Sequence, residues 1–168
     1  QPMETQICVF VDPDKTFQTF FGIGAALTDA SAETWFKLPE AQQKELLQAY
    51  FDKEKGIGYT VARTNINSCD FSSGSYDYVD SNDKELKSFN IEHDRKYKIP
   101  FIKAAMAAAG GRLDLFASPW SPPAWMKDID SWYSPGSAAN NWQGTGGTLK
   151  PRCVATYADY LVRYLDAY

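Results

Sequence analysis

Two tryptophans stand among three prolines in residues 117–127, ASPWSPPAWMK. An apolar run, LDLFA, leads directly into this segment. The prolines fix φ and remove backbone donors, which predicts that a strand ends here. A rigid backbone that holds Trp120 and Trp125 suits a flat apolar ligand, and a sugar ring is a common ligand of this kind. The same indoles also suit a hydrophobic plug under a loop, so residue types alone leave both interpretations open.

A cation and a carboxylate follow one another on a second apolar stretch, residues 56–66 (GIGYTVARTNI). Arg63 lies inside this expected strand, where a buried guanidinium is costly unless a carboxylate or a ligand pairs with it. We therefore expect Arg63 either to point into a polar pocket or to form a structural ion pair. Asp70 follows the end of the strand. Its carboxylate suits paired hydrogen bonds from sugar hydroxyls, and it equally suits a loop cap.

Two other chemistries are not supported by the sequence. The pattern Gly22-x-Gly24-x-x-Leu27 lacks the last small residue of a dinucleotide fingerprint, and no acidic residue ends the next strand as that fold requires. The single histidine, His93, has no serine or cysteine context that would make a catalytic triad. We expect His93 to be a solvated residue of a loop or a helix start.

The composition is that of one ordinary globular domain. The chain has 168 residues, of which 44% are hydrophobic, 23% charged and 15% aromatic. The formal net charge is −4 and there is no basic run, so a nucleic-acid partner is not expected. No apolar stretch approaches the length of a membrane span. The three cysteines are odd in number and lack metal-ligand spacing, so we expect neither a disulfide framework nor a metal, and no cofactor.

The order of the expected elements is that of an α/β protein. Strands alternate with helices, which favours a parallel sheet, and long loops at 67–90 and 128–149 follow the carboxyl ends of strands, where α/β folds build their sites. We expect strands at 5–11, 17–27, 57–66 and 113–117, and helices at 29–38, 39–51, 94–109 (beginning in earnest at Pro100) and 151–168.

Several of these segments together resemble glycoside hydrolase family 30, the family of glucosylceramidases, β-glucosidases, β-1,6-glucanases and xylanases. The resemblance covers nearly the whole chain in the family's order. Family sequences usually have a second glycine where Ala25 stands here. The matching segments are FFGIGAALTDASAET (20–34), GIGYTVARTNINSCDFSSGSYDY (56–78), ASPWSPPAWMK, GGTLKP (146–151) and YADYLVRYLDAY (157–168).

The resemblance implies an eight-unit (β/α) TIM barrel that hydrolyses a β-glycoside with retention, using two carboxyl groups about 5–5.5 Å apart. In this family the acid/base glutamate follows an asparagine at the end of the fourth strand, and the nucleophile glutamate ends the seventh. The chain contains no Asn-Glu dipeptide. A complete barrel needs about 250 residues. We therefore expect about three βα units, with both glutamates beyond Tyr168 and the 168 residues alone inactive.

The domain division follows from the same resemblance. Residues 17–168 are assigned to the first part of the catalytic barrel, which is incomplete in this chain. Residues 1–16 are treated as an N-terminal strand that fits the family's small accessory β-sandwich.

Site residues carry over by position. Asp70 matches the family aspartate that binds hydroxyls of the glycone, and Trp120 matches the tryptophan that lines that subsite. Arg63 matches the arginine beside the nucleophile, where it favours the ionised carboxylate. Phe71 is expected to border the pocket, and Trp125 to support its wall as a weaker substrate-binding candidate.

The resemblance thus predicts part of a retaining β-glycosidase of the glucosylceramidase type, acting in carbohydrate or sphingolipid metabolism. Its partners would be a β-linked glucoside or oligosaccharide and the remainder of the same polypeptide, with a secreted, periplasmic or cell-surface location. Alternatives are a family 30 enzyme for xylan-type or β-1,6-glucan substrates, and a non-catalytic carbohydrate-binding remnant.

Overall fold

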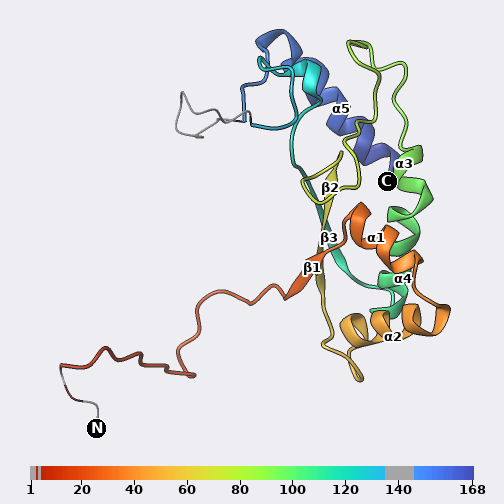
Figure 1. Cartoon of the computed structure of the whole chain (residues 1–168). Coiled ribbons are helices and arrows are strands. Elements are labelled where there is room, and N and C mark those ends of the chain that lie inside the picture. Colours follow the sequence, from red (N-terminus) through yellow and green to blue (C-terminus); the bar gives the residue numbers. More distant parts are fainter. Residues whose placement is uncertain (1–2, 4, 135–145) are drawn as a thin grey trace.

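A parallel sheet organises the computed structural model, which describes residues 3, 5–134 and 146–168 (Figure 1). Its three strands are adjacent in chain order, β1-β2-β3. The register pairs Ala26 with Arg63, and Arg63 with Phe116. The strands are β1 (Gly24–Ala26), β2 (Val61–Ile66) and β3 (Asp114–Pro119). All three run in one direction, so their carboxyl ends meet at one edge.

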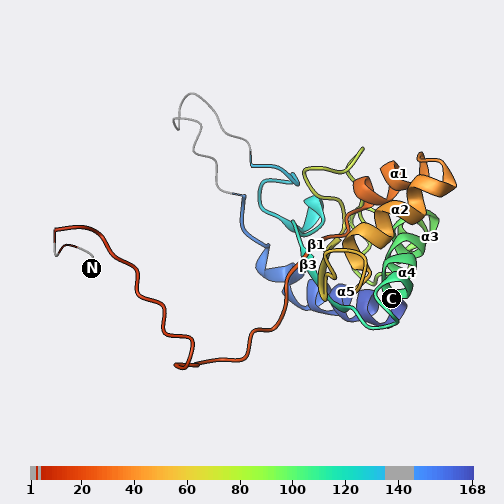
Figure 2. The same cartoon turned by 90° about the horizontal axis from the view of Figure 1, so that it is seen from below.

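The helices cover one face of this sheet, as the two views show (Figures 1 and 2). The α-helices are α1 (Asp29–Phe36), α2 (Glu40–Phe51), α3 (Glu92–Lys96), α4 (Lys98–Ala108) and α5 (Val154–Ala167). Short 3₁₀ turns are η1 (Ala124–Met126) and η3 (Pro151–Cys153). No strand pairs with the free edges of β1 and β3 among the residues described, so the sheet is open, as expected for part of a barrel. The α/β fold class predicted from the sequence is confirmed.

Local sequence explains where several elements begin and end. Thr28 caps α1, because its hydroxyl oxygen accepts the Ser31 backbone N–H at 3.1 Å. Pro39 precedes the first turn of α2. Gly110 and Gly111 follow α4 with positive φ values of 81° and 87°, which end the helix at little steric cost.

Two hydrophobic clusters lie behind the sheet. The first joins β2 to α1, α2 and α4, and its buried members include Ala32, Trp35, Phe51, Ala62, Phe101 and Ala105. The second lies under the loop after β2 and against α5, and its buried members include Ile66, Tyr78, Leu86, Trp125, Met126, Tyr160 and Tyr164. The second cluster therefore supports the carboxyl edge of the strands from behind.

Three sequence-based expectations need correction. Residues 5–11 form no strand in the structure, and the side chain of Ile7 is fully exposed, because no partner strand lies beside them within the described residues. The assignment of residues 1–16 to an accessory sandwich stays a prediction. The strand expected at 17–27 is limited to β1. The helix expected at 94–109 is two helices, interrupted at Tyr97, whose φ of −134° is not helical.

None of the helices described is long and apolar enough to cross a membrane.

Candidate functional site

The polar residues that the sequence singled out lie on β2 and on the loop that follows it. Arg63, on β2, is half-buried, and its Nε donates to Ser118 Oγ on β3 at 2.8 Å. Within the described part of the chain no carboxylate lies within ion-pair distance of the Arg63 guanidinium. The structural ion pair considered from the sequence is therefore not formed there. The arrangement favours the other interpretation, a cation held for a carboxylate or a ligand.

Asp70 and Phe71 lie on the loop that leaves the same end of β2. Both side chains are exposed. The described residues make no hydrogen bond to the Asp70 carboxylate, although neighbouring Ser72 does bond locally, to Asp29 Oδ1 at 3.0 Å. A carboxylate of this kind does not act as a loop cap, and it remains available to hydroxyl donors.

Trp120 and Trp125 differ in their surroundings. Trp120 follows β3 directly and is 37% exposed, with its ring edge-on to Tyr133 at 5.5 Å between centroids. It lines a cavity of about 330 Å³ that includes Pro122 and Trp132. Trp125 is only 7% exposed and belongs to the second hydrophobic cluster. Trp120 therefore has the placement of a ligand wall, whereas Trp125 packs beneath the loop and does not present a face to a ligand.

A polar anchor behind Trp120 was not predicted from the sequence. Lys127 is 3% exposed, and its Nζ donates to Ser121 Oγ at 3.0 Å and to the Trp132 carbonyl at 3.2 Å. Trp132 Nε1 donates to Asp77 Oδ1 at 2.9 Å. Burial raises the pKa of the Asp77 carboxyl to about 6, and it lowers the pKa of the Lys127 ammonium. These contacts depend on how two loops meet, for which the sequence carries no local signal.

A second polar cluster lies behind β2, around Asp94. The Asp94 carboxylate is fully buried and pairs with Lys98 Nζ at 2.7 Å. Burial alone would raise the pKa of Asp94, but the hydrogen bond to His93 and the charge of Lys98 outweigh it and hold this pKa below its usual value. His93 is exposed at the start of α3, as expected, and its ring also stacks on Tyr76 at 3.6 Å between centroids, with its Nδ1 3.5 Å from Asp94 Oδ1.

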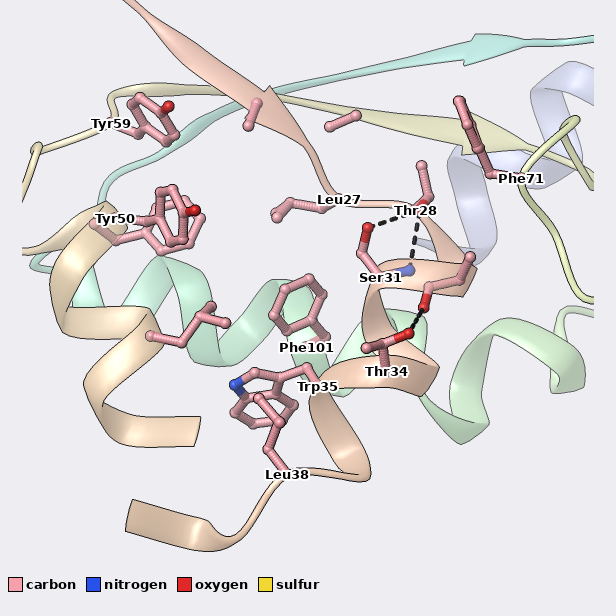
Figure 3. A pocket seen from close by; sticks show the side chains of 15 residues that line it. Leu27, Thr28, Ser31, Thr34, Trp35, Leu38, Tyr50, Tyr59, Phe71 and Phe101 are labelled. Atoms are coloured by element: carbon pink, nitrogen blue, oxygen red, sulfur yellow. Dashed lines mark hydrogen bonds between the residues drawn. The ribbon is translucent and has the colours of Figure 1, made fainter. Parts of the chain in front are cut away.

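A larger cavity, of about 780 Å³, lies elsewhere in the structure (Figure 3). It opens beside β1, α1 and α2 and is walled mainly by apolar side chains, including Leu27, Trp35, Leu38, Tyr50, Tyr59 and Phe101. Its polar atoms are engaged locally, as between Thr28 and Ser31. Phe71, which was expected to border the sugar pocket, lines this cavity and not the one beside Trp120. We place the candidate site at Asp70, Trp120 and Arg63.

The residues described contain no group of three or more His, Cys, Asp or Glu side chains that could hold a metal ion.

Comparisons with known proteins show which proteins this chain is similar to. The model of the glycosyl hydrolase family 30 TIM-barrel domain matches residues 20–168. Putative glucosylceramidase 4 of Caenorhabditis elegans is 40% identical over 162 residues, which are 95% of this chain and 30% of that protein. Lysosomal acid glucosylceramidase of Mus musculus is 39% identical over 98% of this chain and 31% of its own length.

Other relatives are named for a different activity or have a solved structure. An endo-1,6-beta-D-glucanase of Neurospora crassa is 34% identical over 93% of this chain and 31% of that protein. The crystal structure of SrfJ from Salmonella typhimurium superposes with a TM-score of 0.79 at 32% identity, covering 91% of this chain and 32% of that chain. The chain thus spans about a third of the length of the relatives it matches.

Proposed function

This chain belongs to glycosyl hydrolase family 30, and from that premise we propose that it supplies the first three βα units of a retaining β-glycosidase for glucosides of the glucosylceramide type. The observation that carries the proposal is the arrangement of three residues on an open parallel sheet. Arg63 lies on β2 and bonds to Ser118 on β3, and the exposed Asp70 and the partly exposed Trp120 follow the carboxyl ends of these two strands. In barrels of this type the carboxyl edge of the strands is where sites are built. The two curated glucosylceramidases at 39–40% identity support the substrate class.

Each residue has a role that its position allows. Trp120 offers the face of an indole to the apolar face of a sugar ring. Asp70 accepts hydrogen bonds from the hydroxyls of that ring, and a charged acceptor makes such bonds stronger than a neutral one. Arg63 holds a nearby carboxylate in its ionised form, as a nucleophile requires before it attacks the anomeric carbon.

The bond-breaking groups belong, in this proposal, to the rest of the polypeptide. Retention needs a nucleophile and an acid/base carboxyl about 5–5.5 Å apart. The acid/base glutamate would follow an asparagine on the next strand of the barrel, and the nucleophile would come from a later strand. The free edges of β1 and β3 are the places where further strands would pair.

Two other functions remain in view. The fungal β-1,6-glucanase relative favours a glucan as the substrate, with the same site residues. A non-catalytic carbohydrate-binding protein would keep Asp70 and Trp120 but would have no glutamate pair. The polypeptide that continues beyond residue 168 distinguishes these: a strand that ends in Asn-Glu supports the enzyme, and its absence refutes it.

The test uses the full-length protein and an aryl β-glucoside. Asp70→Ala should lower kcat/KM by roughly 10- to 150-fold for each glycone hydrogen bond lost, because such bonds to a charged group contribute about 1.5–3 kcal/mol. Asp80→Ala is the matched control, since Asp80 is an exposed carboxylate on the same loop and should leave kcat/KM unchanged. Normal kinetics of Asp70→Ala would remove Asp70 from the site. Turnover by the isolated 168-residue chain would contradict the placement of the glutamates.

A further inference from the structure

Asn67 lies where β2 passes into the loop that carries Asp70. Its side chain is completely buried, and its φ of 64° places a non-glycine residue in the left-handed region. Asparagine tolerates this region better than most residues, and the turn directs the chain from the sheet toward Asp70. A buried amide has two donors and an acceptor to satisfy, so its partners show what it holds.

The two ends of the Asn67 amide reach different parts of the fold. Nδ2 donates to the carbonyl oxygen of Ser121 at 3.0 Å, and Ser121 is the residue directly after Trp120. Oδ1 accepts a hydrogen bond from the Tyr160 hydroxyl on α5. The amide therefore joins the loop after β2 to the loop after β3, with α5 behind both.

Ser121 is held from a second direction as well. Lys127 Nζ donates to its hydroxyl at 3.0 Å. The hydroxyl and the carbonyl oxygen of Ser121 are therefore both bonded to buried side chains. Proline follows at Pro122 and limits the backbone further. The indole of Trp120 is itself more than a third exposed, so its position depends on this anchored neighbour.

We propose that Asn67 is a positioning residue that fixes Trp120 relative to Asp70, so that the indole face and the carboxylate engage one sugar ring together. The inference rests on the proposed function, because it assumes that both residues contact a glycoside. A site of this kind loses binding when its members shift by about 1 Å, since stacking and hydrogen bonds then cannot be made at once.

The test begins with Asn67→Gly in the full-length protein. Glycine accepts a φ of 64° without strain, so this variant deletes the amide and keeps the backbone turn. We expect KM for an aryl β-glucoside to rise about threefold to tenfold, the range for one hydrogen bond. Tyr160→Phe is the control: it removes the bond to Asn67 on the α5 side and the bond that the Tyr160 hydroxyl accepts from the Tyr78 backbone N–H at 3.1 Å, but it keeps the bond from Asn67 to Ser121. It should lower thermal stability but leave KM unchanged.

A double-mutant cycle with Trp120→Ala separates positioning from general loss of structure. If Asn67 acts through the indole, Asn67→Gly should change kcat/KM little when Trp120 is already alanine. An equal fold decrease in kcat/KM with Trp120 present and with Trp120→Ala would overturn the proposal.

Amide hydrogen exchange tests the coupling between Asn67 and the Trp120 segment without relying on the proposed function. The amides of Ser118, Trp120 and Ser121 should exchange faster in Asn67→Gly than in wild type or in Tyr160→Phe. An inactive wild-type protein that shows this difference would refute the glycosidase and keep the coupling. Equal exchange in Asn67→Gly and wild type would refute the coupling whatever the activity.

Discussion

Asp94 and Lys98 form a buried ion pair behind β2, and replacing Asp94 should destabilise the protein more than replacing Lys98 does. Lys98 Nζ lies 2.7 Å from Asp94 Oδ2, and neither side chain is exposed. The carboxylate also accepts hydrogen bonds from three tyrosine hydroxyls: Tyr78 at 2.5 Å, Tyr168 at 3.0 Å and Tyr76 at 3.1 Å. Lys98, by contrast, has only the Asn65 carbonyl at 2.8 Å and the Tyr78 hydroxyl at 3.3 Å besides Asp94, among the residues described.

This asymmetry determines how much each substitution should lower the free energy of unfolding. Asp94→Asn leaves the Lys98 ammonium buried without a counter-charge, a loss of about 3–5 kcal/mol in the free energy of unfolding. Lys98→Met leaves a carboxylate that still has its three hydroxyl donors. Its expected cost is the charged hydrogen bond alone, about 1.5–3 kcal/mol. The double variant should be less destabilised than the sum of the two, since no unpaired charge remains in it.

The pH dependence gives an independent check with a definite sign. The folded pKa of Asp94 is held below the ordinary value of 3.8, so its contribution is present above pH 3.8 and is lost as pH falls through the folded pKa. Removing the charge of Lys98 raises that folded pKa, so Lys98→Met should lose less stability on acidification than wild type does. Urea unfolding followed by far-ultraviolet circular dichroism at pH 7 and pH 3 measures both effects. A Lys98→Met variant as unstable as Asp94→Asn at pH 7 would refute this reasoning.

Three further predictions concern the loops and the sheet. The pKa of Asp77 is raised to about 6, so the free energy of unfolding should fall as pH rises from about 4 to 6, by at most about 3 kcal/mol. Asp77→Asn keeps an acceptor for Trp132 Nε1 and should abolish this pH dependence in urea unfolding. Thr28→Ala should cost about 1 kcal/mol through the lost cap of α1 while Thr28→Ser should not, as thermal melts would show. A Cβ on Gly24 would lie 1.5 Å from a β2 carbonyl oxygen, so Gly24→Ala should fail to yield folded protein; the control Gly74→Ala, which meets open space, should fold normally.

Much of the fold was predictable because its signals are local. A threonine before α1, a proline before α2 and glycines after α4 set helix boundaries within a few residues, and apolar runs between them indicated the strands. The positions of Arg63 within β2 and of Asp70 on the loop after it followed from the apolar run and the residues that end it. These signals therefore predict the edge of the sheet at which the candidate residues lie.

The remainder depends on partners that are distant in the chain. Residues 5–11 have an alternating apolar pattern, but a strand needs another strand beside it, and none is described there. Trp120 and Trp125 are the same residue type in one short segment, yet only tertiary packing decides which is buried. Lys127 and Asp77 are residue types common in solvated loops. Lys127 is instead held by Ser121 and Trp132 of its own segment, and Asp77 by Trp132 from the loop after β3.

The order of residues along β2 explains why the loops at its carboxyl end are well defined without helix or strand structure of their own. Ala62, in the first half of the strand, packs in the apolar cluster, whereas Thr64, Asn65 and Asn67 are buried polar residues toward its end. Hydrophobic contacts are non-directional and tolerate small shifts, but a buried amide must keep its partners within hydrogen-bond distance or lose them at considerable cost. Apolar replacements could therefore retain the fold while loosening the loops. Polar burial is concentrated at the end of β2, from which the loop that carries Asp70 leaves.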